Sequence, residues 1–485
     1  MNTDLDSSTK HPPVFKYLNA FNTITGLIYG LITALLALFL VQSFKLDPNH
    51  AIGINSSFIG LLFITPILTG YLAGIFGFIK TVIIGCVLSI VSFLFLLSSI
   101  PIIVYLGVGG ISLSVSLYYP AYLVILGRHY TRHDIRRDSA FTVSYMSMNA
   151  GIFLGAMFGG YISQTFSYDC AFIIGSIIFA IALIVFLAVI PKIQFTKDRK
   201  LDDNLRFGHL LGTGLFLSAI VVLLFICGWL LDHSNITHYL MIAFVTIISI
   251  TLLIYAVKQP SETRNKILTF FILAVIAMSF YICFSLEASL VTLFVQTSVQ
   301  LNVICIHISA ASTHGLEPLF VVILAVPLAK MWIWLAKINK EPSFPAKFSL
   351  ALLTMGCGYL IFVLAIFMKQ DDQLIHIGWI VLGYLILSCA DLMLMPVGNA
   401  MVGRLAPQKL EGVFMVTWQS FHGVSAAISA ILVGFVVLPD PSASAEIANP
   451  IYDNAFLGLG MLTIFVGIVA LILVPLVMPP KISSI

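Results

Sequence analysis

Fourteen long apolar stretches dominate this sequence, and each is long enough to cross a lipid bilayer as a helix. A membrane-spanning helix needs about 20 consecutive apolar residues. The chain is 60% hydrophobic and only 9% charged over 485 residues, whereas a soluble protein has about 25% charged residues. The sequence therefore predicts an all-α polytopic membrane protein with spans at 15–42, 51–76, 79–99, 102–127, 139–164, 169–191, 208–231, 236–257, 266–297, 314–337, 346–368, 374–403, 410–438 and 454–478.

The basic residues of the loops fall almost entirely on one side of this predicted membrane layout. When the spans alternate in direction, only Lys45 and Lys369 of the 24 Lys and Arg residues lie on one side, so 22 (24 − 2) lie on the other. Cytoplasmic loops of membrane proteins carry an excess of Lys and Arg. The basic side is therefore predicted to be cytoplasmic, and the even number of spans places both termini there.

The loops divide the fourteen spans into six, two and six. The longest polar stretch, 191–207, follows the sixth span, and the next charged loop, 258–266, follows the eighth. The predicted organisation is a cytoplasmic N-terminal tail at 1–14, a six-helix bundle at 15–191, a cytoplasmic linker with a two-helix insert at 192–265, a second six-helix bundle at 266–478 and a cytoplasmic tail at 479–485.

Composition also excludes several classes of function. The net charge of +3 comes from the loops and gives no reason to expect a nucleic-acid partner. The seven cysteines show no metal-ligand spacing. No nucleophile–base spacing and no Gly-rich phosphate loop is found, so we expect neither an enzyme nor a nucleotide-driven pump. We expect no cofactor, no metal and no obligate protein partner.

Four sequence blocks resemble the proton-dependent oligopeptide transporter (POT) family, a branch of the major facilitator superfamily. They occur in the family's order and are Arg136–Phe141 with Tyr145–Gly151, Glu317–Trp334, Pro342–Phe348, and Ala390–Gly398 with Leu405–Pro407. The resemblance implies the major facilitator fold, with 12 core helices in two six-helix bundles plus the insert. It also implies symport of small peptides driven by the proton gradient. The compact loops and the insert resemble bacterial members, which implies a bacterial inner membrane.

The departures from the family pattern concern charge. Where the family has Glu-x-x-Glu-Arg on its first helix, this chain has Asn22, Thr25 and Gly26. Where the family has a lysine on its fourth helix, this chain has Tyr119. The acid of the tenth core helix survives as Asp391 in place of glutamate. The resemblance therefore implies that the cations for a peptide carboxylate are lost while the acid for its amine is kept.

Three acids lie inside predicted spans, all in the second bundle: Glu287, Glu317 and Asp391. An acid at the bilayer centre costs about 2.5–3.5 kcal/mol on insertion scales, so each needs a partner, water or a proton. We predict that Asp391 binds the substrate amine and takes part in proton coupling, and that Glu287 carries the proton. Glu287 is displaced by two residues from the family's acid, which turns it about 200° around a helix. Glu317 is either a third coupling residue or, as slightly favoured, a solvated residue at the outer mouth.

Further substrate-binding residues follow from the resemblance alone. They are Asn22, Tyr119, Tyr145, Asn149 and Trp418. The alternative is that these side chains are core or interface residues, as aromatic residues in membrane helices usually are.

Two functions from different classes remain open. The first is proton-coupled uptake of di- or tripeptides or related amino compounds, with a bias towards amine-bearing, cationic or neutral ligands, because a desolvated carboxylate without a partner is costly. The second is a different function carried by the same fold: an exporter or antiporter of cationic or amine compounds, or a sensor without coupled flux. The expected partners are the substrate, protons and the lipid bilayer.

Overall fold

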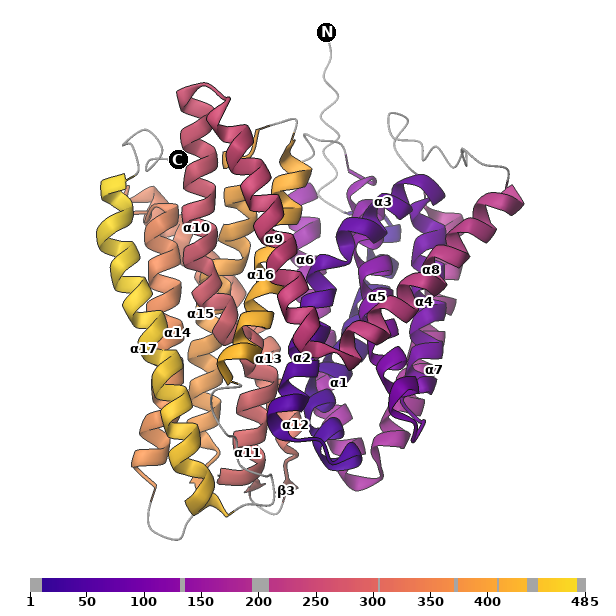
Figure 1. Ribbon diagram of the computed structural model, residues 1–485, viewed down its shortest axis with the longest axis horizontal. Helices are drawn as coiled ribbons and strands as arrows, with labels where there is room; N and C mark the ends of the chain where they lie inside the picture. Colours follow the sequence, from indigo (N-terminus) through magenta and orange to yellow (C-terminus); the bar gives the residue numbers. More distant parts are fainter. Residues whose placement is uncertain are drawn as a thin grey trace.

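The computed structural model describes residues 11–130, 136–193, 209–303, 306–369, 374–407, 410–433 and 444–477. Within these ranges, fourteen helices are long and apolar enough to cross a membrane, which confirms the predicted number of spans. The first of them begins and the last of them ends at the same face of the molecule, here named the termini face (Figure 1). The tail predicted at 479–485, residues 1–10 of the other tail and residues 194–208 of the linker lie outside the described residues.

The N-terminal half contains seven helices, and the insert contains two. Their bounds are α1 Val14–Phe44, α2 Pro48–Ile64, α3 Pro66–Phe76, α4 Phe78–Phe95, α5 Pro101–Gly127, α6 Arg136–Thr165, α7 Tyr168–Val189 with the short η1 Ile190–Lys192, α8 His209–Asp232 and α9 Ser234–Val257. The second predicted span is divided into α2 and α3 because Pro66 has no N–H to continue the hydrogen-bond ladder of the preceding turn.

The C-terminal half holds the remaining helices and four short strands. The helices are α10 Ser261–Leu286, the π-helical turn η3 Glu287–Val291, α11 Thr292–Ser298, α12 Ala310–Thr313, α13 Leu316–Lys337, α14 Phe344–Phe367, α15 Gly378–Leu405, α16 Glu411–Val433 and α17 Ala445–Val477. Strand β1 (Val299–Gln300) pairs in parallel with β4 (Ile375–His376), and β2 (Asn302–Val303) pairs antiparallel with β3 (Ile306–His307).

The last span begins earlier than predicted. Helix α17 starts at Ala445, nine residues (454 − 445) before the expected start. Its first turns contain Glu446, Asn449 and Pro450. Because these residues have low hydropathy, a prediction based on the length of apolar stretches does not include them in the helix. The helix therefore extends beyond the purely apolar segment of the span.

Helices α1 and α6 pack against each other with their backbones almost in contact. A methyl group placed on Gly155 would lie 1.7 Å from the carbonyl oxygen of Leu27, and one on Gly151 would lie 2.1 Å from that of Thr23. Both distances are far below a van der Waals contact, so only glycine fits at these positions. The absence of a side chain on the glycines allows the two helices to approach this closely.

The two-helix insert contacts both halves. Helix α8 packs on α5, whereas α9 packs on α2, α10 and α16 (Figure 1). The buried His238 of α9 attaches this helix to α2, because its Nε2 lies 3.0 Å from the hydroxyl of Ser57 and 3.2 Å from the carbonyl oxygen of Gly53. The insert is therefore fixed to the bundle by polar contacts as well as by apolar packing.

The two halves meet at the face opposite the termini, here named the far face. The hydroxyl of Ser312 in α12 donates to the carbonyl oxygen of Met157 in α6, at 3.0 Å. A methyl group on Gly160 of α6 would lie 2.3 Å from the same Ser312 hydroxyl oxygen. This close contact shuts the space between the halves at the far face.

Candidate functional site

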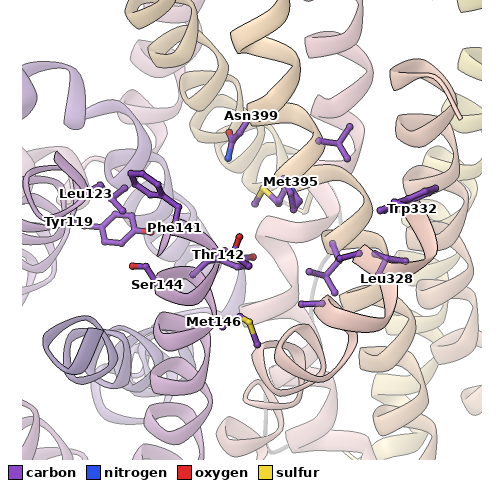
Figure 2. Close-up of a pocket in the computed structure, with 16 residues that line it drawn as sticks. Tyr119, Leu123, Phe141, Thr142, Ser144, Met146, Leu328, Trp332, Met395 and Asn399 are labelled. Carbon is purple, nitrogen blue, oxygen red and sulfur yellow. The ribbon is translucent and has the colours of Figure 1, made fainter. Parts of the chain in front are cut away.

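A cavity of about 480 Å³ lies between the two halves. Its walls come from α5 and α6 of the N-terminal half and from α13 and α15 of the C-terminal half (Figure 2). The lining side chains are Tyr119, Leu123, Phe141, Thr142, Ser144, Tyr145, Met146, Ala325, Leu328, Ala329, Trp332, Leu392, Met395, Pro396, Val397 and Asn399.

The cavity belongs to the half of the bundle near the termini face. Helices α5, α13 and α15 run towards that face and contribute residues from their second halves, while α6 starts there and contributes its first turns. The side chain of Tyr145 is 36% exposed although it lies inside the bundle, because it faces the cavity. The contact between Ser312 and Met157 joins the halves on the opposite side, at the far face.

Asp391 lies directly behind the cavity wall, about midway along α15. Its carboxyl group is buried, and Oδ2 accepts a hydrogen bond of 3.4 Å from the hydroxyl of Tyr145. This bond joins α15 of the C-terminal half to α6 of the N-terminal half. The second oxygen, Oδ1, accepts no hydrogen bond from any described residue. One of the predicted pairs of site residues, Asp391 and Tyr145, is therefore brought together by the fold.

Glu287 also faces the boundary between the halves. It is 3% exposed and opens η3, the π-helical turn that packs against α1 and α2. Its charge interacts with those of Asp391 and Glu317, so the three acids form one electrostatic group. A π-helical turn has a wider spacing than an α-helix and changes the facing of the residues around it. Among the described residues, no three His, Cys, Asp or Glu side chains are arranged to hold a metal ion.

The slightly favoured interpretation of Glu317 as a solvated mouth residue is wrong. Glu317 is only 9% exposed in the first turn of α13. The chain before it, including Ser312, folds against α6 and covers this end of the helix. The backbone carbonyl of Glu317 also accepts a hydrogen bond of 3.0 Å from the hydroxyl of Ser388 in α15. Glu317 thus lies inside the protein, towards the far face from Asp391.

Asn22, predicted as a substrate-binding residue, is placed in the interface between α1 and α6 instead. Its Nδ2 donates to the carbonyl oxygen of Ser144 at 2.7 Å and to the hydroxyl oxygen of Ser144 at 3.1 Å. Tyr122 of α5 lies 2.7 Å from the same hydroxyl through its own. Asn22 is 1% exposed and does not line the described cavity. It positions Ser144, which does.

The structure also explains why a cation is missing next to Asn22. A methyl group on Gly26 would lie 2.5 Å from the carbonyl oxygen of Met148 in α6. No larger side chain fits at position 26 while the two helices keep this distance. The packing of α1 against α6 therefore leaves no room for the family's first-helix arginine.

The other predicted residues divide into two groups. Tyr119 lines the cavity and stacks on Tyr122 with ring centroids 6.4 Å apart. Asn149 donates to the carbonyl oxygen of Tyr145 within its own helix at 3.0 Å and does not line the cavity. Trp418 is 1% exposed and packs edge-on against Tyr281 in the core of the C-terminal half. The prediction that Trp418 contacts substrate has no support in this arrangement, because neighbouring helices cover its ring.

The sequence analysis missed the apolar wall of the cavity. Ala325, Leu328, Ala329 and Trp332 of α13 follow the spacing of one helix face, and Leu392, Met395, Pro396 and Asn399 of α15 repeat the same spacing. Residues at positions i, i+3, i+4 and i+7 share one side of a helix. All of these residues except Asn399 lie within the motif blocks, so the helical spacing inside the blocks could have indicated this wall.

Fourteen candidate membrane-spanning helices among the described residues, in two halves around a cavity at their boundary, have the architecture of a major facilitator transporter. The sequence model of the POT family matches residues 61–448, which is 388 of the 485 residues (448 − 61 + 1). The chain belongs to this family. The resemblance shown by the four sequence blocks is thereby confirmed. The prediction that this chain is a transporter and not an enzyme is confirmed with it.

Individual relatives and solved structures agree with this assignment. The chain is 28% identical over 451 residues to a dipeptide and tripeptide permease B of Yersinia enterocolitica, covering 92% of this chain and 91% of the relative. It is 26% identical to the permease of the same name from Salmonella typhimurium, covering 92% and 91%. A crystal structure of a peptide transporter POT in complex with sulfate is similar with a TM-score of 0.80 at 24% identity, covering 97% of this chain and 96% of that one. The predicted major facilitator fold is confirmed.

Proposed function

We propose that this chain is a proton-coupled importer of dipeptides, tripeptides or related amino compounds, located in a bacterial inner membrane with both termini in the cytoplasm. Membership of the POT family supports this proposal, as do bacterial relatives named dipeptide and tripeptide permeases. Transport proceeds by alternating access, in which the bundles at 15–191 and 266–478 rock against each other around a site at their boundary.

The single observation that carries the proposal is the position of Asp391. Its carboxyl group lies at the boundary of the halves, beside the cavity, and is held by a hydrogen bond from Tyr145 of the opposite half. A substrate amine that displaced the Tyr145 hydroxyl from the cavity wall would reach this carboxylate, whose buried Oδ1 accepts no hydrogen bond from a described residue. Binding at this position therefore acts on a contact that joins the two moving halves.

The position of the cavity fits an importer in its inward-facing state, with the cavity on the cytoplasmic side of the molecule. With the termini face on the cytoplasmic side, the cavity faces the cytoplasm and the extracellular side is closed by the contact of Ser312 with Met157. To load a substrate from outside, the protein would break this contact and close the halves at the termini face. A ligand shifts such an equilibrium only by its difference in affinity for the two states.

The three buried acids supply a path for the coupled proton. Glu317 lies towards the extracellular side, Asp391 lies beside the cavity, and Glu287 interacts electrostatically with both. Like charges in a poorly solvated interior repel each other strongly, so the three carboxyl groups cannot all be ionised at once. A proton that enters at Glu317 can therefore be passed through Glu287 to Asp391, where it competes with the substrate amine.

The test is uptake of radiolabelled dialanine into proteoliposomes that hold the purified protein. An alkaline interior should drive accumulation of the dipeptide, and an ionophore that collapses the proton gradient should abolish it. Absent or gradient-independent uptake would reject the symporter. Proton-driven release of a cationic amine from preloaded vesicles would support an exporter instead, and binding without flux would support a sensor.

Two variants test the role of Asp391. Asp391→Asn should abolish accumulation because an amide cannot hold the amine by charge or carry the proton. Asp391→Glu should keep measurable accumulation, since it restores the acid that the family has at this position. Uptake that persists unchanged in Asp391→Asn would remove the proposed amine site while leaving the transporter itself in place.

A further inference from the structure

The described part of the cavity wall carries no positively charged side chain. Its lining side chains are apolar, hydroxyl-bearing or amide-bearing, and none of the described lining residues is a Lys, Arg or His. A dipeptide in its ordinary form carries a carboxylate that must leave water to enter such a site. A carboxylate buried without a partner is costly, and neutral hydroxyl groups compensate for only part of that cost.

Two described cations lie outside the cavity wall and contact other side chains. Lys347 of α14 lies behind Trp332, with Nζ 4.9 Å from the ring centroid, and forms an ion pair of 2.5 Å with Glu341. Arg404 at the end of α15 lies over the ring of Phe344, 5.1 Å from its centroid. Both positive groups are thus held by other side chains outside the cavity wall.

Position 26 of the first helix cannot hold a cation either. The position that carries arginine in the family is Gly26 here, and a methyl group on it would already lie 2.5 Å from the Met148 carbonyl oxygen. On α5, Tyr119 presents a neutral hydroxyl to the cavity at the position of the family's lysine. Both family cations are therefore absent, one of them for a steric reason.

The two walls of the cavity differ in chemistry. Hydroxyl groups of Tyr119, Thr142 and Ser144 lie on the side of the N-terminal half, whereas Leu328 and Trp332 lie on the other side (Figure 2). Hydroxyl groups both donate and accept hydrogen bonds, so they suit an amide group of either polarity. The opposite wall offers apolar area to a hydrophobic side chain.

The charge that is available to a ligand is negative. Asp391 lies directly behind Tyr145 of the wall, and its Oδ1 is buried without a hydrogen-bond donor among the described residues. An ammonium group is the natural partner for such an oxygen, because charge-assisted hydrogen bonds are the strongest ones that a buried carboxylate forms. The site is therefore built for the amine end of a peptide and not for its acid end.

Building on the proposed function, we infer that the cavity selects amine-bearing compounds that lack a free carboxylate and carry an apolar side chain. Dipeptide amides are the simplest members of this class. The amine would bind at Asp391, the amide groups would bond to the hydroxyl wall, and the side chain would lie against Trp332. Ordinary dipeptides would enter the same site with lower affinity.

Calorimetric titration of the purified protein with three probes tests this inference. The probes are alanyl-phenylalaninamide, alanyl-phenylalanine and N-acetyl-alanyl-phenylalaninamide, at a mildly acidic pH that keeps the free amines protonated. The amide should bind about tenfold more tightly than the acid, since an uncompensated buried carboxylate costs more than a kilocalorie per mole. The acetylated probe, which has no amine, should bind most weakly of all.

The outcomes separate this inference from the function on which it rests. Equal or tighter binding of alanyl-phenylalanine would overturn the inference while leaving peptide transport intact. Equal binding of the acetylated probe would overturn the role of the amine. Failure of every probe to bind would overturn the proposed peptide function and this inference with it.

Two variants place a cation in the cavity and should remove the preference for the amide. Tyr119→Lys restores the family's fourth-helix lysine and should lower the preference for the amide by about tenfold, by tightening the binding of the acid. Tyr119→Phe is the matched control and should keep the preference. If Tyr119→Lys does not fold, Asn399→Lys brings a cation to the same cavity from an exposed position on α15. An unchanged preference in a folded lysine variant would count against the inference.

Discussion

The two halves of this transporter have opposite interiors. No buried side chain described in α1–α7 is charged, and the close packing of α1 on α6 depends on glycines such as Gly155. The C-terminal half instead buries three acids, Glu287, Glu317 and Asp391. The contrast indicates that the N-terminal half is a rigid wall that offers neutral hydroxyl groups, while the C-terminal half handles both the proton and the charge of the substrate.

The largest effect is expected from breaking the rigid wall. Gly155→Ala should destabilise the protein by about 3 kcal/mol, because overpacking a tight contact forces the backbones apart. The Leu27 carbonyl oxygen would lie 1.7 Å from the new methyl group. The apparent melting temperature in detergent measures this loss. Gly74→Ala is the control, since a methyl group there meets nothing within 4 Å; equal melting of the two variants would contradict the tight contact.

The second effect concerns the charged half. Glu287→Gln should reduce proton-driven accumulation of dipeptide by about tenfold or more, because coupling free energies between two sites are about 1–3 kcal/mol. Exchange of labelled for unlabelled dipeptide without a gradient should continue, since that exchange needs no net proton movement. Measuring both in the same vesicles separates coupling from binding. Full accumulation in this variant would show that the proton does not pass through Glu287.

A smaller effect is expected from the polar link inside the rigid wall. Asn22→Ala removes both hydrogen bonds to Ser144 and should lower stability by about 0.6–1.7 kcal/mol, the range measured for bonds between membrane helices. Thermal melting is again the measurement. Asn149→Ala serves as the comparison because its bond stays within α6. A larger loss in Asn149→Ala would mean that Asn22 does not join the helices as described.

The smallest effect is expected from a single hydroxyl of the cavity wall. Thr142→Val keeps the shape of the side chain and should weaken dipeptide binding about two- to fivefold, the value of one neutral hydrogen bond. Thr417→Val is the matched control, since that hydroxyl bonds to the carbonyl oxygen of Val413 in its own helix and does not line the cavity. Equal affinities in titration would remove Thr142 from the hydroxyl wall.

The fold could be predicted from the sequence because its signals are local. Apolar length fixes each span independently of the others, so all fourteen were found. The start of α17 was missed because Glu446 and Asn449 interrupt the apolar run while the backbone continues as a helix. Hydropathy alone is therefore enough to predict the number of spans. The ends of the spans also depend on packing, which hydropathy does not predict.

The candidate site was predicted only in part, because residue type does not fix the direction of a side chain. Asp391, Tyr119 and Tyr145 lie at the cavity or beside it, as expected from motifs on α5, α6 and α15. Trp418 faces the core, and Glu317 is covered because the preceding segment, α12, packs against α6. Such placements follow from contacts between distant segments, which spacing along one helix does not reveal.

The contact at Gly26 also makes a charged side chain at this position difficult to regain by a single substitution. A lineage that loses a charged side chain on an open helix can regain it by one substitution. Here the backbone of α6 occupies the space that such a side chain would need, and the close packing at Gly151 and Gly155 holds the two helices at this distance. Each single step back would be selected against before any benefit from the restored charge appeared. Descendants of this chain would more readily acquire a new cation at an open position, such as Asn399, than recover the ancestral one.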